Sequence, residues 1–180
     1  MAAIKITLWG NIVGAVAWDP QRSHGVLEFT DDFVRTGLDL APLTIPYEDL
    51  LRGQRIFSFP RLNNNTFEGL PGLIADALPD AFGNAVLQGW LRNQNRGSES
   101  LTPLEKLSYV GKRAMGALEF EPEADTPEPE EILEVEKLLD LTNKVLEDKN
   151  SIVLDLSADE EQAMASLIRV GASAGGQRPK

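Results

Sequence analysis

The first thirty residues constrain the fold most, because apolar side chains recur there with the spacing of β-strands. Ile4, Ile6 and Leu8 occupy every second position, as in a strand whose two faces differ. A second apolar run spans residues 12–18, and a third alternating segment spans residues 25–30. Strands this close along the chain pair as antiparallel neighbours, so the chain is expected to open as a small antiparallel sheet.

Turn-forming residues separate these segments. Gly10-Asn11 follows the first one and predicts a two-residue type II′ turn, because glycine readily takes the positive φ of the first central position. Asp19-Pro20 closes the second strand. Residues 31–37 begin with two aspartates and end in glycine, which predicts a short helical turn.

Prolines interrupt the stretch that follows. Pro42, Pro46 and Pro60 each remove a backbone donor, so residues 38–60 are expected to be mostly connection, with one short edge strand near residues 55–59. Three consecutive asparagines, residues 63–65, then predict a loop.

Helical spacing dominates residues 69–111. One apolar stripe spans residues 70–78 and a second spans residues 82–91. Pro79 is expected in the first turn of the second helix, where its missing N–H costs nothing.

A capping box marks the start of the next helix. Thr102 can accept a hydrogen bond from the backbone N–H of Glu105, whose side chain reaches back, and Pro103 fills the first helical position. This helix is expected to end at Gly111. A strand is then predicted within residues 114–120.

Helical spacing resumes in the last third of the chain. It spans residues 132–146 and, behind a second capping box at residues 157–160, residues 164–168. The whole pattern predicts an α+β fold with a small antiparallel sheet and packed helices.

Composition and charge exclude several classes of function. Cysteine is absent, which removes disulfide frameworks, thiolate metal sites and cysteine nucleophiles. The net charge is −11, so direct nucleic-acid binding is not expected. No segment is apolar enough for a signal peptide or a membrane span, which favours a cytoplasmic protein.

Acidic residues concentrate in residues 119–136, which hold nine carboxylates and no basic side chain. Such a run is typical of a solvated linker that leads into a helix. A docking surface for a basic partner is the alternative.

A glycine-rich segment closes the chain. In residues 171–180, Gly175-Gly176, Ser173 and Lys180 could wrap backbone amides and a cation around phosphates. The segment is not a Walker A loop, because Lys180 lies four residues after Gly176 and directly follows a proline. A flexible tail is the alternative.

Few other residues offer chemistry. His24 is the sole histidine and is expected to be an exposed turn residue, since metal-binding histidines need partners. Asp76 and Asp80 could act as an acid–base or cation-binding pair, but carboxylates that flank helices near a proline are more often caps. No catalytic or metal-binding residue is therefore assigned.

Several segments resemble HipA-like serine/threonine kinase toxins. Residues 66–83 read TFEGLPGLIADALPDAFG, and residues 104–122 read LEKLSYVGKRAMGALEFEP. Both are similar to signatures of that family. The opening hairpin, the LTIP of residues 43–46 and the closing GASAGGQRPK also fit, in the same order.

The resemblance implies a division into two parts. Residues 1–111 would form the N-terminal subdomain, and residues 112–180 would begin the kinase N-lobe, with an acidic linker at 119–136 and a glycine-rich loop at 171–180. That loop would contact the phosphates of ATP. Its matching positions are Gly171, Ser173, Gly175, Gly176 and Lys180, with Ser173 as the candidate for autophosphorylation.

The resemblance also implies cofactors and partners. An intact family member would use ATP and Mg²⁺ to phosphorylate a protein such as an aminoacyl-tRNA synthetase. A HipB-like DNA-binding antitoxin would hold it in check.

The chain departs from the family in lacking a catalytic base and Mg²⁺-binding carboxylates beyond the glycine-rich loop, both of which phosphoryl transfer needs. We therefore expect a truncated, N-terminal part of a kinase that is not catalytic alone and uses no cofactor by itself. One alternative is a stand-alone inhibitor of a separately encoded kinase core. Another is a nucleotide-binding module with unrelated chemistry.

Overall fold

The computed structural model describes residues 3–93, 101–114, 116–124 and 164. The chain divides into two compact units, one formed by Met1–Leu78 with Thr102–Ala124 and the other by Pro79–Leu101 with Asp125–Lys180. Within the described residues, no helix has the length and apolar character needed to cross a membrane.

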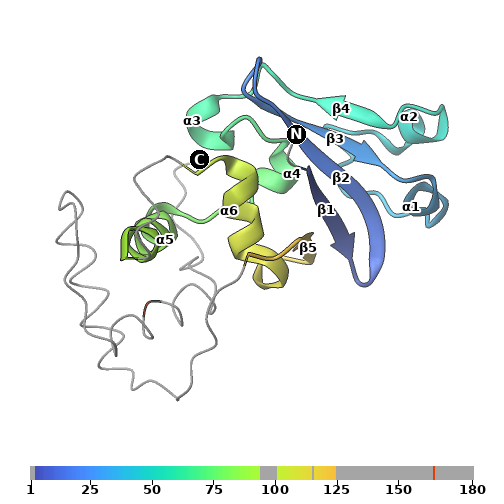
Figure 1. Ribbon diagram of the computed structural model, residues 1–180. Helices are drawn as coiled ribbons and strands as arrows, with labels where there is room; N and C mark the ends of the chain where they lie inside the picture. The colour runs from blue at the N-terminus through green and yellow to red at the C-terminus, as the bar shows by residue number, and fades with distance from the viewer. Residues whose placement is uncertain (1–2, 94–100, 115, 125–163, 165–180) are drawn as a thin grey trace. The chain divides into compact units, whose positions relative to one another are not determined.

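The first unit is built on a five-stranded antiparallel sheet with the order β4-β3-β2-β1-β5 (Figure 1). The strands are β1 (Ala3–Leu8), β2 (Asn11–Asp19), β3 (His24–Phe29), β4 (Ile56–Ser58) and β5 (Leu118–Glu121). The expected α+β class with an antiparallel sheet is confirmed.

The turn between β1 and β2 differs from the prediction. Leu8 pairs with Asn11, so Trp9 and Gly10 form the two-residue loop, with φ values of 48° and 78°. Positive φ at both central residues is the mark of a type I′ turn, not of the predicted type II′ turn. The register explains why the turn comes one residue earlier than predicted. Leu8 is buried and still pairs with Asn11, so Trp9 becomes the first residue of the turn.

A β-bulge in β2 positions the first helix. The register shifts opposite Ile6 and Thr7 and leaves Val13 without a cross-strand partner in β1. The carbonyl of Val13 accepts the backbone N–H of Thr30 at 2.9 Å. The Thr30 hydroxyl in turn caps α1 (Asp31–Arg35) by accepting from the N–H of Phe33. The predicted helical turn is thus confirmed and tied to the sheet.

The proline-rich stretch contains one element that the sequence does not reveal. Strand β4 lies at the sheet edge, as predicted. The unexpected element is α2 (Tyr47–Leu51), which begins directly after Pro46, where a proline removes no helical hydrogen bond. The Tyr47 hydroxyl donates to the carbonyl of Val34 at 2.7 Å and so joins α2 to α1.

Helices α3 (Asn64–Phe67) and α4 (Gly72–Ala75) are both short. The expectation of a loop at the asparagines is wrong, because Asn63 caps α3 by accepting the N–H of Asn65. The apolar stripe of residues 70–78 extends beyond α4, whose C-cap is Asp76.

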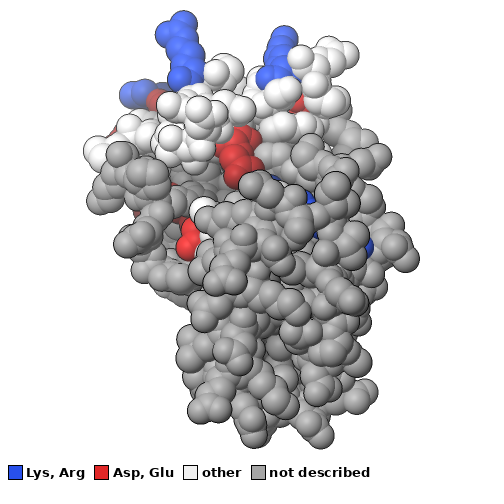
Figure 2. Space-filling model, turned by 90° about the vertical axis from the view of Figure 1, so that its left-hand side faces the viewer, with Lys and Arg blue, Asp and Glu red and all other residues white. Residues whose placement is uncertain are grey.

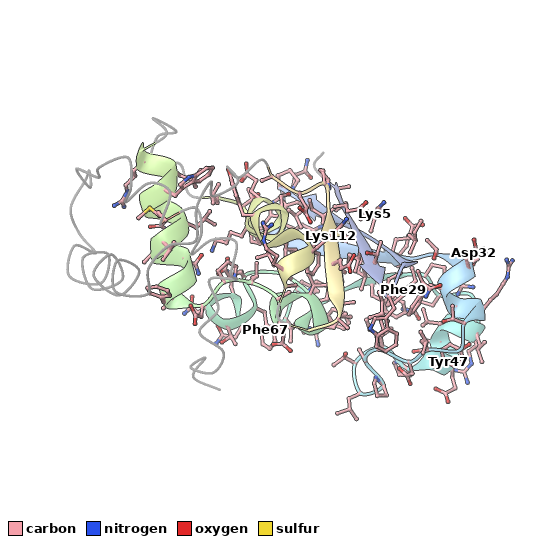
Figure 3. All side chains as sticks on the ribbon, turned by 90° about the horizontal axis from the view of Figure 1, so that it is seen from below. Lys5, Phe29, Asp32, Tyr47, Phe67 and Lys112 are labelled. Atoms are coloured by element: carbon pink, nitrogen blue, oxygen red, sulfur yellow. The ribbon has the colours of Figure 1, made fainter. Side chains whose placement is uncertain are left out.

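One face of the sheet packs on helices to form the core. Phe29 lies within it, with its ring 6.0 Å from that of Phe33 and 5.8 Å from that of Phe57 (Figure 3). Burying each large apolar side chain stabilises the fold by about 1.5–3 kcal/mol. Large side chains that are buried in this core include those of Ile6, Leu27, Phe33, Ile45, Leu70, Ile74, Leu104, Leu107 and Phe120.

Helix α6 (Pro103–Val110) begins at the predicted capping box. Thr102 accepts the N–H of Glu105 at 3.3 Å, and the Glu105 carboxylate accepts the N–H of Thr102 at 2.7 Å. The helix ends at Gly111, where a single 3₁₀ turn (Gly111–Arg113) begins.

Strand β5 returns the chain to the sheet, beside β1. Residues 118–121 therefore lie in the same sheet as the opening hairpin, although the family resemblance implies an N-terminal subdomain that ends at residue 111. Glu119 and Glu121, the first carboxylates of the acidic run, are strand residues. The rest of that run beyond residue 124 lies outside the described residues.

In the second unit, the structure describes α5 (Ala81–Asn93). Asp80 precedes it and accepts the N–H of Gly83 at 2.8 Å, so Asp80 is the cap. Pro79 therefore precedes the cap and does not lie in the first turn as predicted. The expected helices at residues 132–146 and 164–168 fall outside the described residues, apart from Met164.

Candidate functional site

The glycine-rich loop predicted to contact ATP lies outside the described residues and stays a prediction. This applies to all of its assigned positions: Gly171, Ser173, Gly175, Gly176 and Lys180. The two signature segments, residues 66–83 and 104–122, lie within the described part except for residue 115. The contacts of these two segments show their structural roles.

Gly69 holds the first signature against the β2–β3 hairpin. Its φ is +75°, a region that favours glycine, and its carbonyl accepts the N–H of Gly25 at 2.8 Å. A Cβ at Gly69 would lie 2.5 Å from the carbonyl oxygen of Ser23, which is too close for any side chain. This glycine therefore serves packing.

An ion pair joins the two signatures. The Lys106 ammonium of α6 lies 2.7 Å from the Glu68 carboxylate, and the two side chains are only 15% and 30% exposed. Removing either partner would leave the other charge partly desolvated, which costs stability. Glu68 and Lys106 are thus structural in this arrangement.

The second signature guides the chain from α6 into β5. Gly111 has a φ of +56°, and a Cβ there would lie 2.6 Å from the Glu123 side chain. That glutamate accepts the N–H of Lys112 at 2.9 Å, and the N–H of Ala124 donates to the carbonyl of Ser108 at 2.9 Å. These bonds fix the end of the first unit.

Arg113 is a polar residue that sequence reasoning did not single out. Its Nη2 donates to the carbonyl of Tyr109 at 3.2 Å, but its buried Nε has no hydrogen-bond partner in the described part of the chain. A buried donor without an acceptor costs about 1–3 kcal/mol. No pattern in the sequence distinguishes it from an exposed arginine.

The structure corrects the expectation for His24. The residue is only 5% exposed, because it begins β3 opposite Asp19 and lies beside Gly69. Its Nδ1 lies 3.4 Å from the carbonyl of Arg22. The turn pattern around His24 did not reveal that residues 67–71, which we call the FEGLP loop, lie beside it.

Asp76 and Asp80, the candidate acid–base or cation-binding pair, each lie at the end of a helix. Asp80 caps α5, as the more frequent role of such residues suggests, and Asp76 is the C-cap of α4. No group of three or more His, Asp or Glu side chains suited to a metal ion occurs among the described residues.

The sheet face opposite the core carries exposed charged and apolar side chains. One row crosses all five strands and consists of Glu121, Lys5, Ala15, Glu28 and Ile56. Lys5, Glu28 and Ile56 are exposed. We call this surface the open face.

Two ion pairs organise the charges of the open face. Lys5, which is labelled in Figure 3, forms a close pair with Glu121 of the neighbouring strand β5. The hydrogen bond from Lys5 lowers the pKa of Glu121 below its ordinary value of 4.5, and the charge of Lys112 acts in the same direction. Arg55 pairs with Asp31, with Nε 2.7 Å from Oδ1.

A hollow of about 470 Å³ lies at the end of the open face next to α1. This volume is within the range of about 300–1,000 Å³ that is usual for binding sites. Ala15 has a small side chain and lies between Lys5 and Glu28 in the row across the strands. The lining includes Lys5, Ile12, Glu28, Asp31 and Arg55.

Charges of both signs appear on the surface viewed in Figure 2, where basic side chains project above carboxylates in the described part. That part of the view shows no continuous basic surface of the kind that binds a phosphate backbone.

Comparison with known proteins identifies one family. A family model described as HipA N-terminal domain matches residues 4–121. No curated protein and no solved structure matches the chain.

Proposed function

The chain belongs to the family of HipA N-terminal domains, and from this premise we propose that it is the non-catalytic N-terminal part of a HipA-like protein serine/threonine kinase. The family match over residues 4–121 carries the proposal, because this span ends at the last residue of β5. The first unit would then be a scaffold for a kinase core.

The chemistry of the described residues supports a scaffold role. Phosphoryl transfer needs a base that orients the attacking hydroxyl and carboxylates that hold Mg²⁺. The described part contains neither a suitable carboxylate cluster nor an exposed histidine. The signature residues Gly69, Glu68 and Gly111 are all engaged in packing or ion pairing.

The proposal extends to the family's cofactors and partners. The glycine-rich loop would contact ATP·Mg²⁺ held by the kinase core, and Ser173 would be phosphorylated there. A phosphoserine would add about −1.5 to −2 charges beside the ATP phosphates, so repulsion would move the loop away. The substrate would be a protein such as an aminoacyl-tRNA synthetase, and the regulator a HipB-like antitoxin in a toxin–antitoxin system.

A stand-alone inhibitor of a separately encoded kinase core is the second candidate. The pairing of β5 with β1 favours the inhibitor, because all five strands of the sheet then lie within residues 1–124. A unit that contains its whole sheet could bind a kinase core in trans.

Mixing the purified chain with a HipA-like kinase core that lacks its own N-terminal domain separates the two candidates. The core's phosphorylation of a protein substrate is measured with and without the chain. A rise supports the proposed role as a missing kinase part, whereas a concentration-dependent fall supports the inhibitor. No effect and no co-elution would contradict both.

A further inference from the structure

We propose that the open face docks a basic segment of a partner protein, with a lysine or arginine of that segment paired to Glu28 in the hollow. The inference concerns the sheet surface alone and does not depend on kinase activity. It rests on the charges that remain unpaired on this face, on the exposed apolar residues beside them and on the shape of the hollow.

Glu28 is the free charge of the hollow. Both cations of its lining are already engaged, since Lys5 pairs with Glu121 and Arg55 pairs with Asp31. The Glu28 side chain is exposed and has no hydrogen bond or ion pair to any described residue, since Arg55, the cation of the lining along the sheet edge, pairs with Asp31. Once Lys5 and Arg55 are paired with other carboxylates, the Glu28 carboxylate of the hollow has no unpaired cation beside it in the described part of the chain. A cation of a binding partner could therefore pair with it.

Apolar side chains flank this carboxylate. Ile12 lines the hollow and is 50% exposed, and Ile56, which pairs with Glu28 across the strands, is 59% exposed. Trp9, at the tip of the hairpin that carries Ile12, is 72% exposed. Exposed aromatic and aliphatic residues around a charge are typical of the anchor positions of protein interfaces.

The charge of the chain distinguishes between the possible binding partners of the open face. Phosphate backbones and anionic lipids would be repelled by a chain of net charge −11 and by Glu28. A second copy docked through the same face would oppose Glu28 and Glu119 with like charges, because the nearby cations are already paired. A basic protein segment satisfies Glu28 and is steered by the net charge.

The test uses the full chain and a phage-displayed library of random peptides. Peptides that bind the immobilised chain are expected to carry Lys or Arg beside an apolar residue. The most enriched peptide is synthesised and its affinity is measured by calorimetry. Glu28→Lys should weaken binding by about tenfold or more, and Glu28→Gln should weaken it less. Glu48→Lys makes the same change on α2 and should leave the affinity unchanged.

Further measurements make the result decisive. Amide chemical shifts should move around Ala15 and Glu28 when the peptide is added, and circular dichroism should show that each variant is folded. If Glu28→Lys does not fold, Glu28→Gln alone decides. The inference is overturned if no peptide is selected, if selected peptides lack basic residues, or if Glu28 variants bind normally. A dimer in sedimentation that Glu28→Lys dissociates would also overturn it, in favour of a second copy.

Discussion

Gly69 and Gly37 share a φ of +75°, but of the two only Gly69 has backbone atoms of other segments within contact distance of an added methyl group. Gly37→Ala should therefore cost only backbone strain, about 1 kcal/mol. Gly69→Ala should cost about 3 kcal/mol or more, because its Cβ would also collide with the carbonyl of Ser23. Urea denaturation of both variants measures the difference. Equal losses would show that the FEGLP loop is not packed as described.

The Lys5–Glu121 pair predicts a pH dependence at the scale of one residue. Because the pKa of Glu121 lies below 4.5 in the folded chain, the pair adds stability above the unfolded value and loses it as the pH falls through the folded value. An NMR titration should show that Lys5→Met raises the midpoint of the Glu121 carboxyl toward 4.5. An unchanged midpoint would contradict the pairing.

Residue-level expectations fail where tertiary contacts decide. The sequence around His24 has the composition of an exposed turn, and its burial depends on Gly69, distant along the chain. Trp9 adopts a positive φ that its residue type disfavours, because the register of β1 against β2 requires it. Such contacts are invisible to local patterns.

At the scale of elements, the capping box of α6 gives a direct prediction. Thr102→Ala removes the acceptor for the N–H of Glu105 and should lower the free energy of unfolding by about 1 kcal/mol. Thr102→Ser keeps the hydroxyl and should be close to the original stability. Thermal and urea unfolding compare the two. A loss of the same size in both would mean that the hydroxyl contributes nothing to the cap.

Elements with a clear period were predictable, and those set by distant partners were not. The alternating segments that form β1 and β3, the apolar run that forms β2 and the capping box of α6 carry their own local signals. Helix α2 lies in a proline-rich stretch whose composition does not predict a helix. The pairing of β5 with β1 joins residues that are too far apart along the chain for a local pattern to predict it. The hollow was not predictable either, because it depends on which side chains share one face.

At the scale of the whole molecule, the family signatures and the hollow that holds Glu28 occupy different places, because no residue that lines the hollow belongs to either signature. The signatures join α3, α6 and β5 to the sheet, whereas the open face carries Glu28 and the exposed isoleucines. The signatures can thus identify the fold while leaving the partner to a separate surface. The predicted ATP-contacting loop at residues 171–180 remains a prediction at this scale.

Phosphate transfer from radiolabelled ATP to the purified chain, in the presence of Mg²⁺, tests the central claim most directly. A HipA-like kinase core with a protein substrate serves as the positive control for the nucleotide and metal. The account predicts no labelling of the chain alone, at Ser173 or elsewhere, and no release of phosphate. Labelling of the isolated chain that is lost in Ser173→Ala would contradict it, because the chain would then be a catalyst.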